Sequence, residues 1–163
     1  MKTKNIPPLN TSPKNREKAQ SLVELAISLV FMLTLVAGLI DIGRAFFTYI
    51  ALRDAAQEGA AFASIARENQ TDGMVCNSII TRAQGTSDTQ IVDLNQTQVN
   101  ISFDGVDCAS ASNTNACFGK AVEVYVTYPA FPLSVPFLGT VLGSQTIPIQ
   151  ASIIDTVLTP PCN

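Results

Sequence analysis

The stretch LAISLVFMLTLVAGLI, from Leu25 to Ile40, decides how this chain folds. Its sixteen residues carry no charge. As an α-helix it would rise about 24 Å, at roughly 1.5 Å per residue, which is less than a hydrocarbon core of about 30 Å. Extending the helix at both ends makes it long enough but takes Glu24 and Asp41 into or near the membrane. We therefore predict a transmembrane segment over about residues 22–43.

The charges on the two sides of this stretch differ in sign. Five of the ten Lys and Arg residues precede Glu24, and from Gln20 onward five basic residues face twelve acidic ones, a balance of -7. A basic flank before an apolar run stays in the cytoplasm, so the acidic remainder is expected outside. The acidic remainder also argues against nucleic acid as a partner, because binding phosphates needs clustered Lys and Arg. Residues 1–19, rich in Asn, Pro, Lys and Thr, are predicted to form a disordered cytoplasmic leader.

The helical pattern continues past the apolar stretch without proline, so one continuous helix is predicted over residues 20–67. Along its second half, Ala55, Gly59 and Ala63 recur at four-residue spacing. Small residues at this spacing let another element approach the backbone closely, and we assign this face to packing against other subunits. The alternative is that Ala is present only as a good helix former. Gly59 argues against this alternative, because Gly costs about 1 kcal/mol in a helix interior.

Residues 68–163 are predicted to form an extracytoplasmic α+β domain. Residues 75–83 fit a short amphipathic helix, and apolar and polar residues alternate over 98–103, 122–128 and 147–153, as in half-buried strands. Pro148 marks the third of these as an edge strand. The fold class is thus α+β, with a long N-terminal helix, transmembrane and then amphipathic, packed on a small antiparallel sheet. The apolar, Pro-rich stretch 129–143 is predicted either to pack on the sheet as a loop or to contact a subunit or the membrane surface.

The four cysteines, Cys76, Cys108, Cys117 and Cys162, all follow the apolar stretch. An even number confined to an exported segment favours two disulfides. Spacing allows three pairings. Our preferred pairing joins Cys108 to Cys117 across a local polar loop, and Cys76 to Cys162.

The residues needed for common catalytic chemistry are missing from the sequence. Without His there is no Ser-His-Asp or Cys-His pair, and the sequence lacks the glycine-rich phosphate-binding motifs. The cysteines have no CxxC spacing, which argues against a zinc site. We predict that the protein is not an enzyme and uses no metal or other cofactor.

Glu24 is the most unusual residue in the apolar region. A lone carboxylate at the start of a membrane helix is costly unless it has a partner. It is either solvated among the lipid headgroups or paired with a positive charge. Cleavage before Gln20 would create an α-amino group four residues upstream of Glu24, and in an assembly that amine could pair with the Glu24 of a neighbouring chain.

Several short motifs carry a resemblance to a known family. KAQSLVE (Lys18–Glu24) before an apolar helix resembles the type III signal sequence of the type IV pilin superfamily. LIDIGRAFF (Leu39–Phe47) with AAQEGA (Ala55–Ala60) is similar to the TadE-like family, the minor pilins or pseudopilins of tight-adherence (Flp) pilus systems. A weaker similarity to that family covers residues 122–154, including VYVTYP (Val124–Pro129). The strongest similarity covers residues 19–61.

The resemblance implies a pilin-like fold and a structural function in assembling a tight-adherence pilus. It implies that a prepilin peptidase cuts between Ala19 and Gln20, which makes Glu24 the fifth mature residue. The other implied partners are the membrane, further pilin or pseudopilin subunits and the inner-membrane assembly platform. The implied location is the cytoplasmic (inner) membrane or the pilus itself, with one span, a cytoplasmic N-terminus and a periplasmic or extracellular domain. The alternative is a single-span surface adhesion or binding protein that never enters a pilus.

Overall fold

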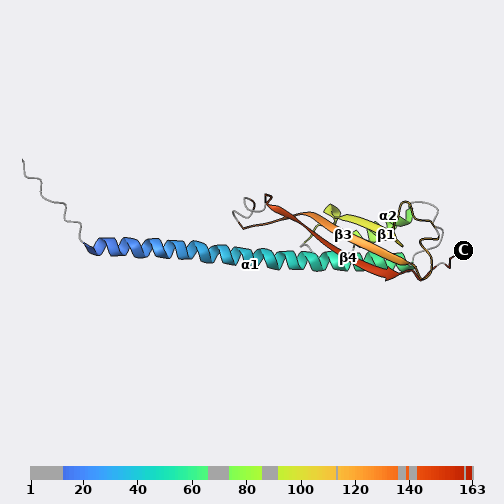
Figure 1. Ribbon diagram of the computed structural model, residues 1–163, viewed down its shortest axis with the longest axis horizontal. Coiled ribbons are helices and arrows are strands. Elements are labelled where there is room, and N and C mark those ends of the chain that lie inside the picture. The colour runs from blue at the N-terminus through green and yellow to red at the C-terminus, as the bar shows by residue number, and fades with distance from the viewer. Residues whose placement is uncertain are drawn as a thin grey trace, which may run out of the picture.

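A computed structural model of the chain describes residues 13–65, 74–85, 92–112, 114–135, 139, 143–159 and 161–162. It has two α-helices, one short 3-10 helix and four strands within these ranges. In chain order they are α1 (Pro13–Ile65), α2 (Met74–Gln84), η1 (Leu94–Gln96), β1 (Gln98–Phe103), β2 (Val106–Asp107), β3 (Ala121–Pro132) and β4 (Thr146–Thr156). Figure 1 shows α1 as a long rod that projects far beyond a small sheet lying along its C-terminal half. The predicted α+β architecture is confirmed.

Helix α1 is 53 residues long, which corresponds to about 80 Å at roughly 1.5 Å per residue. It contains the predicted helix as far as Ile65; residues 66–67 lie outside the described part of the chain. The helix begins earlier than predicted. Residues 13–18, which the prediction placed in a disordered leader, are helical. Pro13 is compatible with this start, since the first helical position needs no backbone N–H donor. The rest of the predicted leader, residues 1–12, lies outside the described residues.

The sheet is antiparallel throughout, with strand order β2-β1-β3-β4. Its central register aligns Ile101 of β1 with Val124 of β3, and Val124 with Ile153 of β4. Strand β4 lies at an edge, as Pro148 predicted. Strand β3 continues past the predicted end to Pro132, through an irregularity between Tyr128 and Phe131. The first part of the apolar stretch 129–143 is therefore strand, because β4 offers backbone partners there.

The core forms where the second half of α1 meets the sheet and α2. Ala55 and Ala63 are almost fully buried in this core. At Gly59, an added Cβ would lie 3.2 Å from the Ala83 Cβ and 3.3 Å from the Val124 Cγ1. The small-residue face thus lets α2 and β3 approach the helix backbone. This corrects its assignment to packing against other subunits, since the chain's own domain already covers it.

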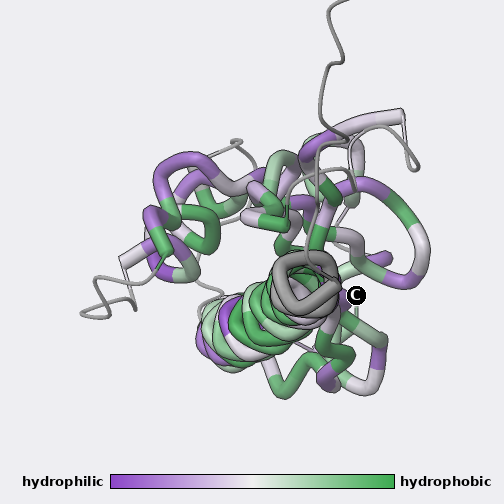
Figure 2. The backbone as a smooth tube through the Cα atoms, turned by 90° about the vertical axis from the view of Figure 1, so that its left-hand side faces the viewer, coloured by the Kyte–Doolittle hydropathy of each residue, from purple (hydrophilic) through white to green (hydrophobic). Residues whose placement is uncertain are grey.

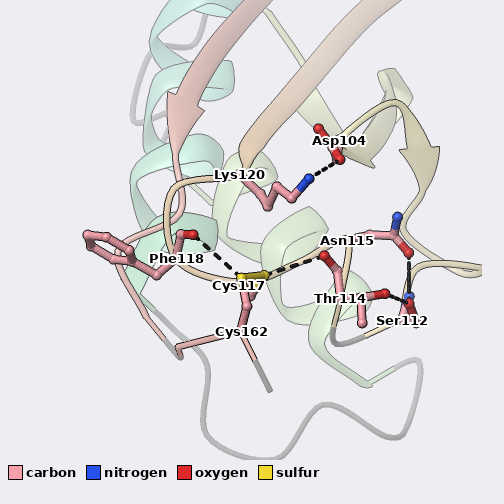
Figure 3. The surroundings of a disulfide bond; sticks show 8 residues. All are labelled: Asp104, Ser112, Thr114, Asn115, Cys117, Phe118, Lys120 and Cys162. Carbon is pink, nitrogen blue, oxygen red and sulfur yellow. Dashed lines mark hydrogen bonds and ion pairs between the residues drawn. A yellow bond between two sulfur atoms is a disulfide. The ribbon is translucent and has the colours of Figure 1, made fainter.

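The structure contains two disulfides, as predicted, but with a different pairing. Cys76 is bonded to Cys108, and Cys117 to Cys162. The predicted pairing assumed one open loop over residues 104–120. Instead β2 folds back on β1, which carries Cys108 away from Cys117, toward α2. Figure 3 shows Cys117 bonded to Cys162 of the C-terminal segment, near the ion pair that joins Lys120 to Asp104 at 2.7 Å.

Candidate membrane and assembly surface

The N-terminal part of α1 has a continuous apolar surface that the sheet does not cover. Its large apolar side chains are 54% to 72% exposed from Leu22 to Ile40. They are Leu22, Val23, Leu25, Ile27, Leu29, Val30, Phe31, Met32, Leu33, Leu35, Val36, Leu39 and Ile40. Figure 2 shows α1 nearly end-on, with mostly hydrophobic residues along it. We call residues 22–36 the bare segment. By length and composition α1 can cross a membrane, which makes the chain a single-pass membrane protein candidate.

The residues predicted for processing lie together at the start of the bare segment. Ala19, Gln20 and Glu24 are all exposed and helical. Gln20 and Glu24 are four residues apart, about one helical turn, so they share one side of α1. Ala55, Gly59 and Ala63 lie far along the same helix, inside the domain core. The structure thus separates the predicted site residues into two groups with different surroundings.

Asp41 is the most deeply buried charged group at the boundary between the bare segment and the domain. It is only 5% exposed, although it follows directly after the uncharged stretch. Its Oδ2 accepts hydrogen bonds from the backbone N–H groups of Ser134, at 2.7 Å, and Val135, at 3.0 Å. Its Oδ1 lies 3.5 Å from Arg44 Nη1. Asp41 therefore joins α1 to the end of the β3–β4 hairpin.

Arg44 completes this contact from the next turn of the helix. It donates a hydrogen bond to the Ser134 hydroxyl at 2.9 Å, and its guanidinium lies 5.3 Å from the centre of the Phe131 ring. The spacing of Asp41 and Arg44 indicates that these two side chains can pair, which the structure shows. The partners in the hairpin were not predicted, because 93 residues separate Ser134 from Asp41 and no local pattern links them.

A groove of about 620 Å³ lies between α1 and α2. It is lined by Glu58, Phe62, Asn77, Ser78, Thr81, Arg82 and Gly85. Arg82 reaches across it to Glu58, with an Nη2 to Oε1 distance of 2.6 Å. Both side chains are substantially exposed, so this pair contributes little to stability. Among the described residues, no group of three or more His, Cys, Asp or Glu side chains could hold a metal ion.

The fold and its bare segment thus define a protein with one membrane-length N-terminal helix and a small disulfide-bonded α+β domain. A family model described as TadE-like protein matches residues 19–61. This match confirms the resemblance to the TadE-like family over the residues where the sequence similarity is strongest. It ends before residues 122–154, where the weaker similarity stays a prediction. No curated protein and no solved structure matches the chain.

Proposed function

We propose that this protein is a structural, membrane-anchored pseudopilin or minor pilin that takes part in assembling a tight-adherence pilus of the type IV kind. One observation carries the proposal: the family match coincides with α1, and α1 has an uncovered apolar segment followed by a segment built into a folded domain. A subunit of this shape can be held first in a bilayer and then in a bundle of similar helices. The proposed role is structural and not catalytic.

The bare segment needs an apolar environment. Burying one Leu, Val, Ile or Phe side chain contributes about 1.5–3 kcal/mol, so the eleven half-exposed large apolar side chains of the bare segment represent on the order of 10–20 kcal/mol. That is comparable with the entire stability of a typical domain, about 5–15 kcal/mol. Such a surface is not left in water, and it is apolar all round, as in a membrane span. Lipid and the helices of neighbouring subunits are the two environments that we propose for it.

The distribution of charge and the chemistry of the cysteines support the proposed orientation. The basic residues before Glu24 favour a cytoplasmic N-terminus. Both disulfides lie in the domain at the other end of the helix, and disulfides persist in oxidising compartments. Together these features support a periplasmic or extracellular domain.

Glu24 is the proposed assembly contact. Cleavage by a prepilin peptidase between Ala19 and Gln20 would place a new amino group about one turn from Glu24. Within a filament, the amine of one subunit would pair with the Glu24 of its neighbour, and removal from water would strengthen their attraction. The partner of this carboxylate would then exist only after the leader is removed.

Mass spectrometry and N-terminal sequencing of the protein from membranes and from sheared pili test the proposal. We expect a mature chain that begins at Gln20 and co-isolates with other pilins. An uncut chain that stays in the membrane and never accompanies pilus proteins would contradict the proposal and favour a surface adhesion protein.

Substitution of Glu24 tests its role separately. Glu24→Ala should leave membrane insertion and cleavage largely intact but reduce incorporation into pili, because it removes only the carboxylate. Glu58→Ala is the matched control, since Glu58 pairs with Arg82 within the domain. Equal incorporation of the Glu24→Ala, Glu58→Ala and unaltered chains would show that Glu24 is merely solvated at the interface.

A further inference from the structure

The β3–β4 hairpin extends beyond the domain core and returns along α1 toward the bare segment (Figure 1). The hairpin pairing continues past the strands, because the Leu133 N–H donates to the Gln145 carbonyl oxygen at 2.9 Å. Phe131 and Val135 are buried in this part of the molecule. We call residues 131–135 with 143–146 the hairpin end.

The hairpin end touches α1 within the uncharged stretch. A Cβ placed on Gly38 would lie 3.9 Å from the Val135 Cγ2, so these two residues are at the same level along the helix. A hydrocarbon core of about 30 Å needs about 20 helical residues. Any window of that length that contains most of the uncharged stretch and leaves Lys18 outside includes Gly38. If α1 spans the membrane, Val135 therefore lies at hydrocarbon depth.

Of the two carboxylate oxygens of Asp41, Oδ2 has the hydrogen bonds that a charge needs at this depth, and Oδ1 has only the nearby Arg44 charge, with Nη1 3.5 Å away. Asp41 is three residues beyond Gly38, about 4.5 Å along the axis. Where water is scarce, a charged group must find its partners in the protein. The hairpin end supplies two backbone N–H groups, and Arg44 supplies a countercharge. The backbone N–H groups of the hairpin end thus take the place of water at Oδ2 of Asp41.

The composition of the hairpin suits the same environment. From Val124 to Ile154 the sequence has no charged residue at all. The flanking charges, Glu123 and Asp155, lie at the far end of β3 and β4, where Val122 pairs with Asp155. An uncharged hairpin with its charged residues at the opposite end can enter a lipid interface without burying a charge.

From these observations we propose that the hairpin end is a second membrane contact, seated beside α1 in the leaflet that faces the domain and covered by phospholipid acyl chains at Leu133. The proposal rests on the membrane anchor of the proposed function. Lipid is the occupant that the geometry favours over a second copy, because the contact lies beside a part of α1 that is at hydrocarbon depth before any assembly. The domain would therefore rest on the membrane and not stand away from it on a free helix.

Depth-resolved quenching of a fluorophore tests this contact. A single added cysteine at Leu133 is labelled with an environment-sensitive fluorophore, without reductant, so that both disulfides stay intact. The full chain is reconstituted in vesicles of phosphatidylethanolamine and phosphatidylglycerol that carry brominated acyl chains. Leu29→Cys in the bare segment is the positive control, and Leu158→Cys, 53% exposed at the far end of the domain, is the aqueous control. If Leu133→Cys does not fold, Gln145→Cys reports on the same level of the hairpin.

We expect bromine to quench the labels at positions 29 and 133, with blue-shifted emission at both, and to leave position 158 unquenched. A label at 133 that behaves like the one at 158, while 29 is quenched, overturns the proposal but leaves the anchor intact. A label at 133 that is shielded from both brominated lipid and aqueous iodide overturns it in favour of a protein contact. Absence of quenching at position 29 overturns the membrane anchor itself, and with it the proposed function.

Discussion

The two halves of α1 belong to one unbroken helix, yet they are built for different surroundings. Leu33 in the bare segment is 60% exposed, whereas Leu52 in the second half is completely buried. The bare segment is apolar on all sides, which suits a partner that surrounds it. The second half is apolar and small on the one side where α2 and the sheet pack. Apolar residues alone therefore do not define a core. Their distribution around the helix decides whether they pack against the chain's own domain or face lipid or another subunit.

The most severe test of the independence of the two halves weakens the domain and leaves the bare segment intact. Replacing Cys117 and Cys162 by Ala should lower the free energy of unfolding by about 2–5 kcal/mol, because the bond closes a long loop and ties the C-terminal segment to the sheet. Urea unfolding in detergent micelles measures the loss, and membrane fractionation should be unchanged. If fractionation failed together with the domain, the two halves would not be independent.

A matched pair of glycines gives the next largest effect. Gly59→Val should destabilise the domain by about 1–3 kcal/mol, since its side chain would overlap Ala83 and Val124. At Gly43 no atom lies within 4 Å of an added Cβ, so Gly43→Val should stay within about 0.5 kcal/mol of the unaltered protein. Urea unfolding of both variants checks this difference. Equal effects would mean that the second half of α1 is not packed as the structure shows.

Asp41 lies at the junction of the two halves, and its loss should act locally. Asp41→Ala leaves the N–H groups of Ser134 and Val135 without their acceptor, which costs about 1–3 kcal/mol. The cost should appear as opening of the hairpin end more than as global unfolding. Hydrogen exchange at residues 133–135, compared with β1, measures it. Asp54→Ala, an exposed substitution on α1, is the control, and equal exchange in the two variants would count against the Asp41 contact.

Some of this architecture follows from local sequence, and some does not. The long helix, the three main strands and the edge position marked by Pro148 each depend on periodicity or on one residue's backbone chemistry, so they were predictable. The cysteine pairing was not, because β2 reverses the chain within four residues of β1 and changes which cysteines meet.

The role of the small-residue face was mispredicted for a related reason. Spacing shows that something approaches Gly59 closely, but not whether that element belongs to the same chain. The Asp41 contact likewise depends on where a distant hairpin returns, since the acceptor and its donors are 93 and 94 residues apart. Local patterns therefore identified the surfaces of α1 but not the elements that cover them.

The smallest effect that we predict is a pH dependence of the domain's free energy of unfolding. The Asn95 side chain, the Asn95 backbone N–H and the Gln96 side chain donate to Asp93, and these hydrogen bonds hold the pKa of its carboxyl below the ordinary value. A pKa that is lower in the folded state adds stability above the unfolded pKa of about 3.9, and that stability is lost as the pH falls through the folded value. Asp93→Asn should therefore flatten the acid limb of domain stability, measured by urea unfolding across this range, while vesicle binding through the bare segment stays constant. Parallel acid limbs in the two proteins would show that the 3-10 turn at Leu94–Gln96 does not depend on the charge of Asp93.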